Sequence, residues 1–441
     1  MKIIAFPTER TSTTSRLQSR SPREWDARER SVDLAATTQK FVGLDAVRAG
    51  AALGVVLFHA CVPYLQNPMP GLSWTVRDSA NASIDWLFWG IEVFIMPLFL
   101  VLAGFFAWQT LSRRGVHLGA RTLVTNRAKR LLIPLAFAVC VVLPLDLYIW
   151  VLAWVAEGIV EPIKLKSMKF DGVVDRDLWG LSHLWFLLYV FLYVVVTAIV
   201  ARVNVLRNAV RKVAEKPALA FTVLAISAAV TLGVAPNVVW GFQHEFYPVL
   251  SKWIYSGTFF AAGLLIAKVD PSLSRFQNKT RMLGIASVML LLTAVSLGRW
   301  HLAIGENAMA QAGLAIVTVL AAYAVTLFAI AVSRPIPRLP VGIQYLAAAS
   351  FWIYLVHHPI LGLVHLDLKL LLPNANPILK MILAFAISVG GSVLTYEALV
   401  RCTRLGRILG MQWQSQTVSA VGVPLPRDHV ETEPAPQRIA A

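Results

Sequence analysis

Apolar residues recur along this chain in runs of about twenty, separated by short polar or charged segments. A helix needs about twenty apolar residues to cross the hydrocarbon core of a bilayer. The pattern therefore predicts an all-α polytopic membrane protein with about ten transmembrane helices. The predicted spans are 44–64, 84–108, 131–154, 181–201, 217–235, 251–267, 282–299, 311–333, 343–365 and 377–399.

Both ends of the chain lack this pattern. Residues 1–40 are rich in Ser, Thr and Arg, and residues 411–441 show no apolar periodicity. Segments of this composition cannot bury enough apolar surface to fold. We therefore expect two solvated, disordered tails that flank a membrane domain over residues 41–410.

The distribution of charge predicts the orientation. The chain has 40 Lys and Arg residues, and the segments that ten spans leave on the side of the tails contain thirty of them. Short cytoplasmic loops retain Lys and Arg, so we expect both termini in the cytoplasm. Most of the formal charge of +16 is thus an orientation signal, and we expect no nucleic-acid partner.

Composition and missing motifs exclude other classes. With 57% apolar and 15% charged residues, the chain does not have the composition of ordinary soluble domains. Three cysteines with no CxxC pair exclude a disulfide scaffold. The absence of a phosphate-binding glycine loop argues against an ATP-driven pump.

The first predicted span carries polar residues along one face. Arg48 and His59 are eleven residues apart, so both project from one side of a helix, about 16 Å apart along its axis. Asp45 lies three residues before Arg48 and can pair with it. The alternatives are an Arg48 that snorkels to the cytoplasmic interface and a neutral His59 that hydrogen-bonds a neighbouring helix.

The ninth predicted span contains a second polar motif. His357 lies at a depth similar to that of His59 in a helix that runs the same way, so we expect the two imidazoles to meet in one cavity. Pro359 has no amide hydrogen, which frees the carbonyl of Leu355. Because neighbouring helical side chains diverge by about 100°, His358 is not expected to share the role of His357. A zinc ion held by three histidines is the rival, but no carboxylate or cysteine with ligand spacing accompanies them, so we expect no metal.

Three further residues lie nearer the outer side. Glu92 enters the second span from that side to about the depth of His59, and is a candidate carboxylate to orient the site. A hydrogen bond between helices explains Glu92 equally well. His183 and Trp185 are expected at the outer mouth of the fourth span, where an aromatic-belt tryptophan with an interfacial histidine is the alternative.

A basic cluster precedes the third span. Arg127 and Arg130 are three residues apart on one helical face, at the entrance to the bilayer. Positive-inside bias alone predicts part of the cluster. Paired guanidiniums, however, form two-point contacts with phosphate oxygens that lysines cannot form. We therefore interpret Arg127 and Arg130 as a phosphate-binding pair.

These motifs together resemble the membrane acyltransferase-3 family over roughly residues 40–410. The matching motifs are Arg48 with His59 after ten intervening residues, 94–106, 127–134, His183-Leu-Trp185 and 354–359. The end of the last span, 396–407, is similar to the branch that contains the periplasmic glucan succinyltransferases.

The resemblance implies transfer of an acetyl or succinyl group from cytoplasmic acyl-coenzyme A to a carbohydrate or glycoconjugate hydroxyl, in a bacterial inner membrane. Acyl-coenzyme A is then a co-substrate, and no cofactor is permanently bound. In this interpretation His59 is the general base and His357 orients the substrate or thioester. The residues expected to bind acyl-coenzyme A are Arg48, Arg127 and Arg130, and those expected to bind or orient the substrate are Asp45, Glu92, His183, Trp185 and Tyr354.

Two other classes remain open at this point. Intramembrane Arg, His and Glu also fit a proton-coupled secondary transporter or exporter, in which such residues relay protons. Carriers are often built from repeats, and the sequence shows no internal repeat. A non-catalytic membrane sensor is the third class, and it would tolerate mutation of Arg48, His59 and Arg127.

Overall fold

The computed structural model describes residues 41–113, 116–170, 178–305 and 307–412, and these are organised by helices with no β-strand among them. The tails predicted at 1–40 and 411–441 lie outside the described residues, except for Met411 and Gln412.

Within the described residues, ten helices are long and apolar enough to cross a membrane, which confirms the predicted count. They are α2 (Val42–Cys61), α3 (Ala82–Ser112), the run from α4 (Val116–Arg127) to α6 (Leu143–Ala156), α9 (Trp185–Arg202), α11 (Pro217–Val234), α12 (Leu250–Val269), α13 (Thr280–Ile304), α14 (Ala308–Ser333), α15 (Val341–Leu371) and α16 (Pro377–Leu399).

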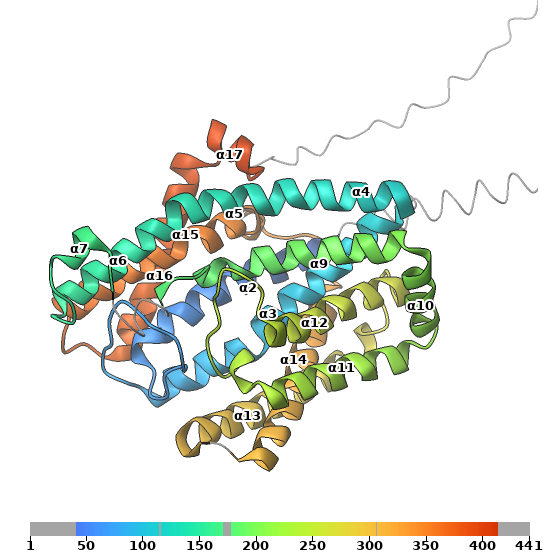
Figure 1. Ribbon diagram of the computed structural model, residues 1–441, viewed down its shortest axis with the longest axis horizontal. Helices are drawn as coiled ribbons and strands as arrows, with labels where there is room; N and C mark the ends of the chain where they lie inside the picture. Colours follow the sequence, from blue (N-terminus) through green and yellow to red (C-terminus); the bar gives the residue numbers. More distant parts are fainter. Residues whose placement is uncertain (1–40, 114–115, 171–177, 306, 413–441) are drawn as a thin grey trace, which may run out of the picture.

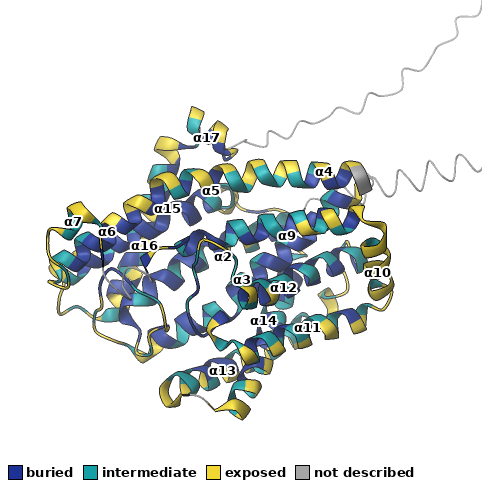
Figure 2. Cartoon of the chain, viewed as in Figure 1, coloured by how far each residue is buried: buried dark blue, intermediate teal, exposed yellow. Residues whose placement is uncertain are grey.

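Four helices form the centre of the bundle. Helix α2 packs between α3 and α15, and α12 packs along α3 (Figure 1). Helices α11 and α13 lie at the edge, where many of their residues are exposed (Figure 2). These exposed residues include apolar ones such as Val223 and Ile285. The buried polar residues of α2 and α15, such as His59 and His357, therefore face protein. The exposed apolar faces of α11 and α13 suit contact with lipid.

Two glycines bring α3 and α12 into close contact. A Cβ atom on Gly104 would lie 2.1 Å from the carbonyl oxygen of Phe260, and one on Gly263 would lie 2.1 Å from the carbonyl oxygen of Val101. Small residues allow membrane helices to approach closely in this way. This contact fixes α3, which carries Glu92, against α12.

The third span is longer than predicted. Its helical path continues from α4 through two π-helical segments, Ala128–Leu132 and Ala138–Val142, to the end of α6. The prediction began at residue 131 because the charged residues before it end the apolar pattern. Helix α4 nevertheless stays helical because it packs against α9 through small apolar side chains such as Ala120 and Ala198.

The described chain begins and ends at one end of the bundle. Phe41 lines a cavity there together with Arg130. Near the other terminus, α17 (Arg404–Leu409) contacts α5 (Ile133–Phe137), and the hydroxyl of Tyr396 donates to the carbonyl oxygen of Met411. That this end faces the cytoplasm stays a prediction.

Candidate active site

Four histidines from three segments meet in the middle of the bundle. His59 comes from α2, His183 from the short helix η4 (Ser182–Leu184), and His357 and His358 from α15. All four are buried. Nε2 of His357 lies 3.1 Å from Nδ1 of His59, which confirms that these imidazoles meet. The ring centres of His183 and His358 lie 6.4 and 5.0 Å from that of His59.

Backbone partners assign the protons of the central pair. Nδ1 of His357 faces the carbonyl oxygens of Ile353 and Tyr354, at 3.1 and 2.8 Å, so it carries the hydrogen. Nε2 of His357 is then an acceptor for Nδ1–H of His59, which also points at the carbonyl oxygen of Val55, 2.9 Å away. The lone pair of His59 is therefore on Nε2, where a base needs it.

Pro359 helps to place His183. The missing amide of Pro359 frees the carbonyl of Leu355, as predicted, and Nε2–H of His183 donates to that oxygen over 3.2 Å. The hydroxyl of Tyr354 donates to the backbone carbonyl of His183. His183 begins the fourth span, Ser182–Arg202, as expected. These two bonds hold η4 in the histidine cluster, so the alternative of an interfacial histidine is wrong.

A carboxylate that the sequence analysis missed pairs with the cluster. Nδ1–H of His358 donates to Oδ2 of Asp146 in α6 over 2.7 Å, and both side chains are buried. His358 therefore does belong to the cluster, although it diverges from His357 along the helix. A charged residue inside an apolar span is costly, and this signal could have identified Asp146 in the sequence.

Glu92 is the carboxylate that was expected to orient the site. It lines a small cavity with Lys252 of α12, another residue that the sequence analysis missed. Lys252 is buried, donates to the carbonyl oxygen of Gln243 over 2.5 Å, and lies 3.7 Å from the ring centre of Trp185. Trp185 is buried too, so the interpretation as an aromatic-belt residue is wrong.

Two cavities approach the cluster. The histidine cavity, of about 60 Å³, is lined by His59, His183, Glu92, Trp185 and Lys252 among others. The arginine cavity, of about 670 Å³, opens at the end that carries Phe41, and its polar lining includes Asp45, Arg48, Arg113, Arg127 and Arg130. Tyr354 and Met96 line both cavities, so the two meet at these side chains.

The polar stripe of α2 runs through both cavities, as its spacing predicts. Asp45 and Arg48 form an ion pair of 3.1 Å and line the arginine cavity, together with Ala52. Val55 and His59 line the histidine cavity. The structure thus brings together the predicted site residues, while their catalytic and binding roles stay predictions.

No metal site accompanies the cluster: the described ranges contain no group of three or more His, Cys, Asp or Glu side chains arranged to hold an ion.

Comparison with known proteins gives one match. A family model described as an acyltransferase domain matches residues 41–397, which include the histidine cluster and both cavities' polar residues. No curated protein and no solved structure matches the chain.

Proposed function

The chain belongs to the membrane acyltransferase-3 family, and we propose that it is an integral membrane O-acyltransferase that uses cytoplasmic acyl-coenzyme A to acylate a carbohydrate or glycoconjugate hydroxyl. An acetyl- or succinyl-type acyl group and a bacterial inner membrane are part of this proposal. One observation carries it: an arginine-lined cavity from one end of the bundle meets a histidine-lined cavity at Tyr354 and Met96.

The arginine cavity suits the donor. Its volume of about 670 Å³ lies within the range of cofactor sites, about 300–1,000 Å³. Four arginines line it against one aspartate, and guanidinium groups bind phosphate oxygens in two-point contacts. Arg48, Arg127 and Arg130 would hold the coenzyme A phosphates, which leaves the thioester arm to extend towards Tyr354.

His59 would act as the general base. Its Nε2 accepts the proton of the acceptor hydroxyl while the oxygen attacks the thioester carbon. A C–O bond forms, the C–S bond breaks, and the imidazolium returns the proton to the departing thiolate. A positioned base contributes about 10²–10⁴-fold to the rate.

The surrounding groups favour the charge that develops on His59. His357 accepts the Nδ1–H of His59, a hydrogen bond that strengthens when the ring becomes positive. The carboxylate of Asp146, held behind His358, adds a negative charge at the edge of the cluster. These residues are positioning groups in the proposal, and His59 is the group that touches the substrate.

The test uses purified protein in detergent with labelled acyl-coenzyme A and a sugar acceptor. His59→Ala should reduce transfer by at least a hundredfold while the protein keeps its thermal stability. Normal turnover by this variant would remove His59 from the mechanism. A proton-coupled carrier would consume no acyl-coenzyme A in detergent and would act only in sealed vesicles with a gradient, so this assay also separates the two classes.

A further inference from the structure

We propose that a separate cavity, at the end of the bundle opposite the arginine cavity, binds the body of a neutral, polyhydroxylated acceptor sugar. This inference rests on the proposed function. The cavity, here called the vestibule, has a volume of about 570 Å³. It is lined by the segment from Val62 to Ala80 and by the end of α6, including Trp154 and Glu157.

The vestibule and the histidine cavity differ in volume. About 60 Å³ beside His59 holds a few water molecules or one hydroxyl-bearing carbon. The histidine cavity is thus smaller than ordinary ligand sites, which measure about 300–1,000 Å³, and we place the body of the sugar elsewhere while one hydroxyl reaches His59. The vestibule has the volume of an ordinary ligand site.

The vestibule lies next to the base. Met69 and Leu72 line both the vestibule and the histidine cavity, so flexible apolar side chains separate the two spaces. Trp74, on the vestibule wall, stacks on His59 with ring centres 5.9 Å apart and planes 11° apart. An acceptor in the vestibule is therefore one side-chain layer from the cavity that His59 lines.

The lining has the chemistry of a sugar site. Trp74 and Trp154 provide aromatic walls, and the hydroxyl of Thr75 is buried without a hydrogen-bond partner in the described chain. Asp78 and Glu157 add carboxylates, which accept hydrogen bonds from hydroxyl groups. One arginine lines the vestibule and four line the arginine cavity, so the vestibule attracts an anion less strongly than the arginine cavity does.

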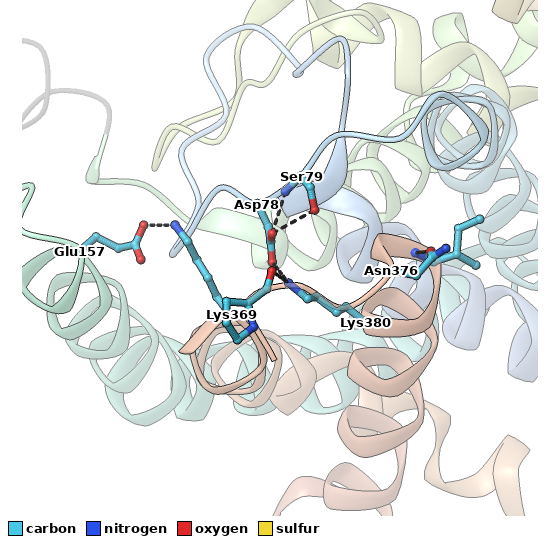
Figure 3. Close-up of polar contacts among 8 residues, drawn as sticks. Asp78, Ser79, Glu157, Lys369, Asn376 and Lys380 are labelled. Atoms are coloured by element: carbon cyan, nitrogen blue, oxygen red, sulfur yellow. Dashed lines mark hydrogen bonds and ion pairs between the residues drawn. The ribbon is translucent and has the colours of Figure 1, made fainter. Parts of the chain in front are cut away.

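Ion pairs hold the two carboxylates in place. Lys380 donates to Asp78 over 2.8 Å, Ser79 also bonds Asp78, and Lys369 pairs with Glu157 (Figure 3). A carboxylate has about four acceptor positions, so each keeps capacity for a ligand hydroxyl.

The wall of the vestibule is preformed. Asp85 accepts hydrogen bonds from the backbone amides of Gln66 and Asn67. Nε1–H of Trp154 donates to the backbone carbonyl oxygen of Trp74. The indole Nε1–H of Trp74 in turn donates to Nδ1 of His365. A site that is ordered before binding loses less conformational entropy when the ligand arrives.

Site-directed labelling tests the proposal. In a background with Cys140 and Cys402 replaced by alanine, Ser73→Cys places a thiol on the vestibule wall, and Asn374→Cys places a control thiol at an exposed position outside it. The rate of maleimide labelling is measured on purified protein with and without methyl glycosides and gluco-oligosaccharides of two to six units.

We expect at least one sugar to slow the labelling of Ser73→Cys tenfold or more and to leave that of Asn374→Cys unchanged. The labelled Ser73→Cys protein should lose transfer to that sugar and still bind acyl-coenzyme A. Labelling rates that no sugar alters would overturn the site. Protection by a sugar in a protein that never consumes acyl-coenzyme A would support the site and refute the proposed function instead.

Discussion

Replacing His357 with leucine removes the side chain that accepts the Nδ1–H of His59, and its effect can be worked out from the contact. The two nitrogens are 3.1 Å apart in a buried site. When His59 takes the acceptor's proton, this hydrogen bond gains a charged donor, and such bonds contribute about 1.5–3 kcal/mol. The carbonyl oxygen of Val55, 2.9 Å from the same nitrogen, still accepts this hydrogen in the variant, so we expect a loss at the lower end of that range. Since about 1.4 kcal/mol corresponds to a factor of ten, kcat should fall about tenfold.

The KM for acyl-coenzyme A should stay unchanged in His357→Leu, because His357 does not line the arginine cavity. Steady-state kinetics of His357→Leu, His59→Ala and the double variant give the full comparison. Because His357 acts only through His59, the double variant should be no slower than His59→Ala. Losses that multiply in the double variant would refute this reasoning and give His357 an independent role.

Three further predictions address the donor cavity, the helix packing and the vestibule. Arg130→Ala should raise the KM for acyl-coenzyme A about tenfold, because a charge-assisted contact with phosphate is lost. The KM for the sugar should stay constant. An unchanged KM for acyl-coenzyme A would exclude Arg130 from the phosphate site. Gly104→Ala should lower the free energy of unfolding by about 1–3 kcal/mol through overpacking. Gly90→Ala is the control, because its Cβ would meet no atom within 4 Å, and it should leave the free energy of unfolding unchanged. Thermal unfolding in detergent measures both. Burial raises the pKa of Asp78, but hydrogen bonds from Lys380 and Ser79 outweigh this and lower it overall. The ionised carboxylate of Asp78 therefore stabilises the folded state fully above the pKa of the unfolded chain, about 4. This contribution is lost as the pH falls through the lower pKa of Asp78 in the folded state. Asp78→Asn should flatten the pH dependence of Tm in this range, and an unchanged profile contradicts the assignment.

The sequence alone predicts the features that one helix encodes by itself. Apolar length predicts the ten spans, because each helix must cross the same hydrocarbon thickness. The helical repeat predicts the stripe from Asp45 to His59, and equal depth in parallel helices predicts the contact between His59 and His357. The absence of an amide on Pro359 predicts the free carbonyl of Leu355.

Only the tertiary structure determines which helices are neighbours. Asp146 contacts His358 because α6 packs against α15, and Lys252 of α12 lies over the ring of Trp185. The inward position of His183 likewise depends on bonds to another helix. Ten apolar helices present similar surfaces, and side-chain packing over their whole length selects among the arrangements. The spacing within each span is therefore local information, and the contacts that complete the site are a property of the packed bundle.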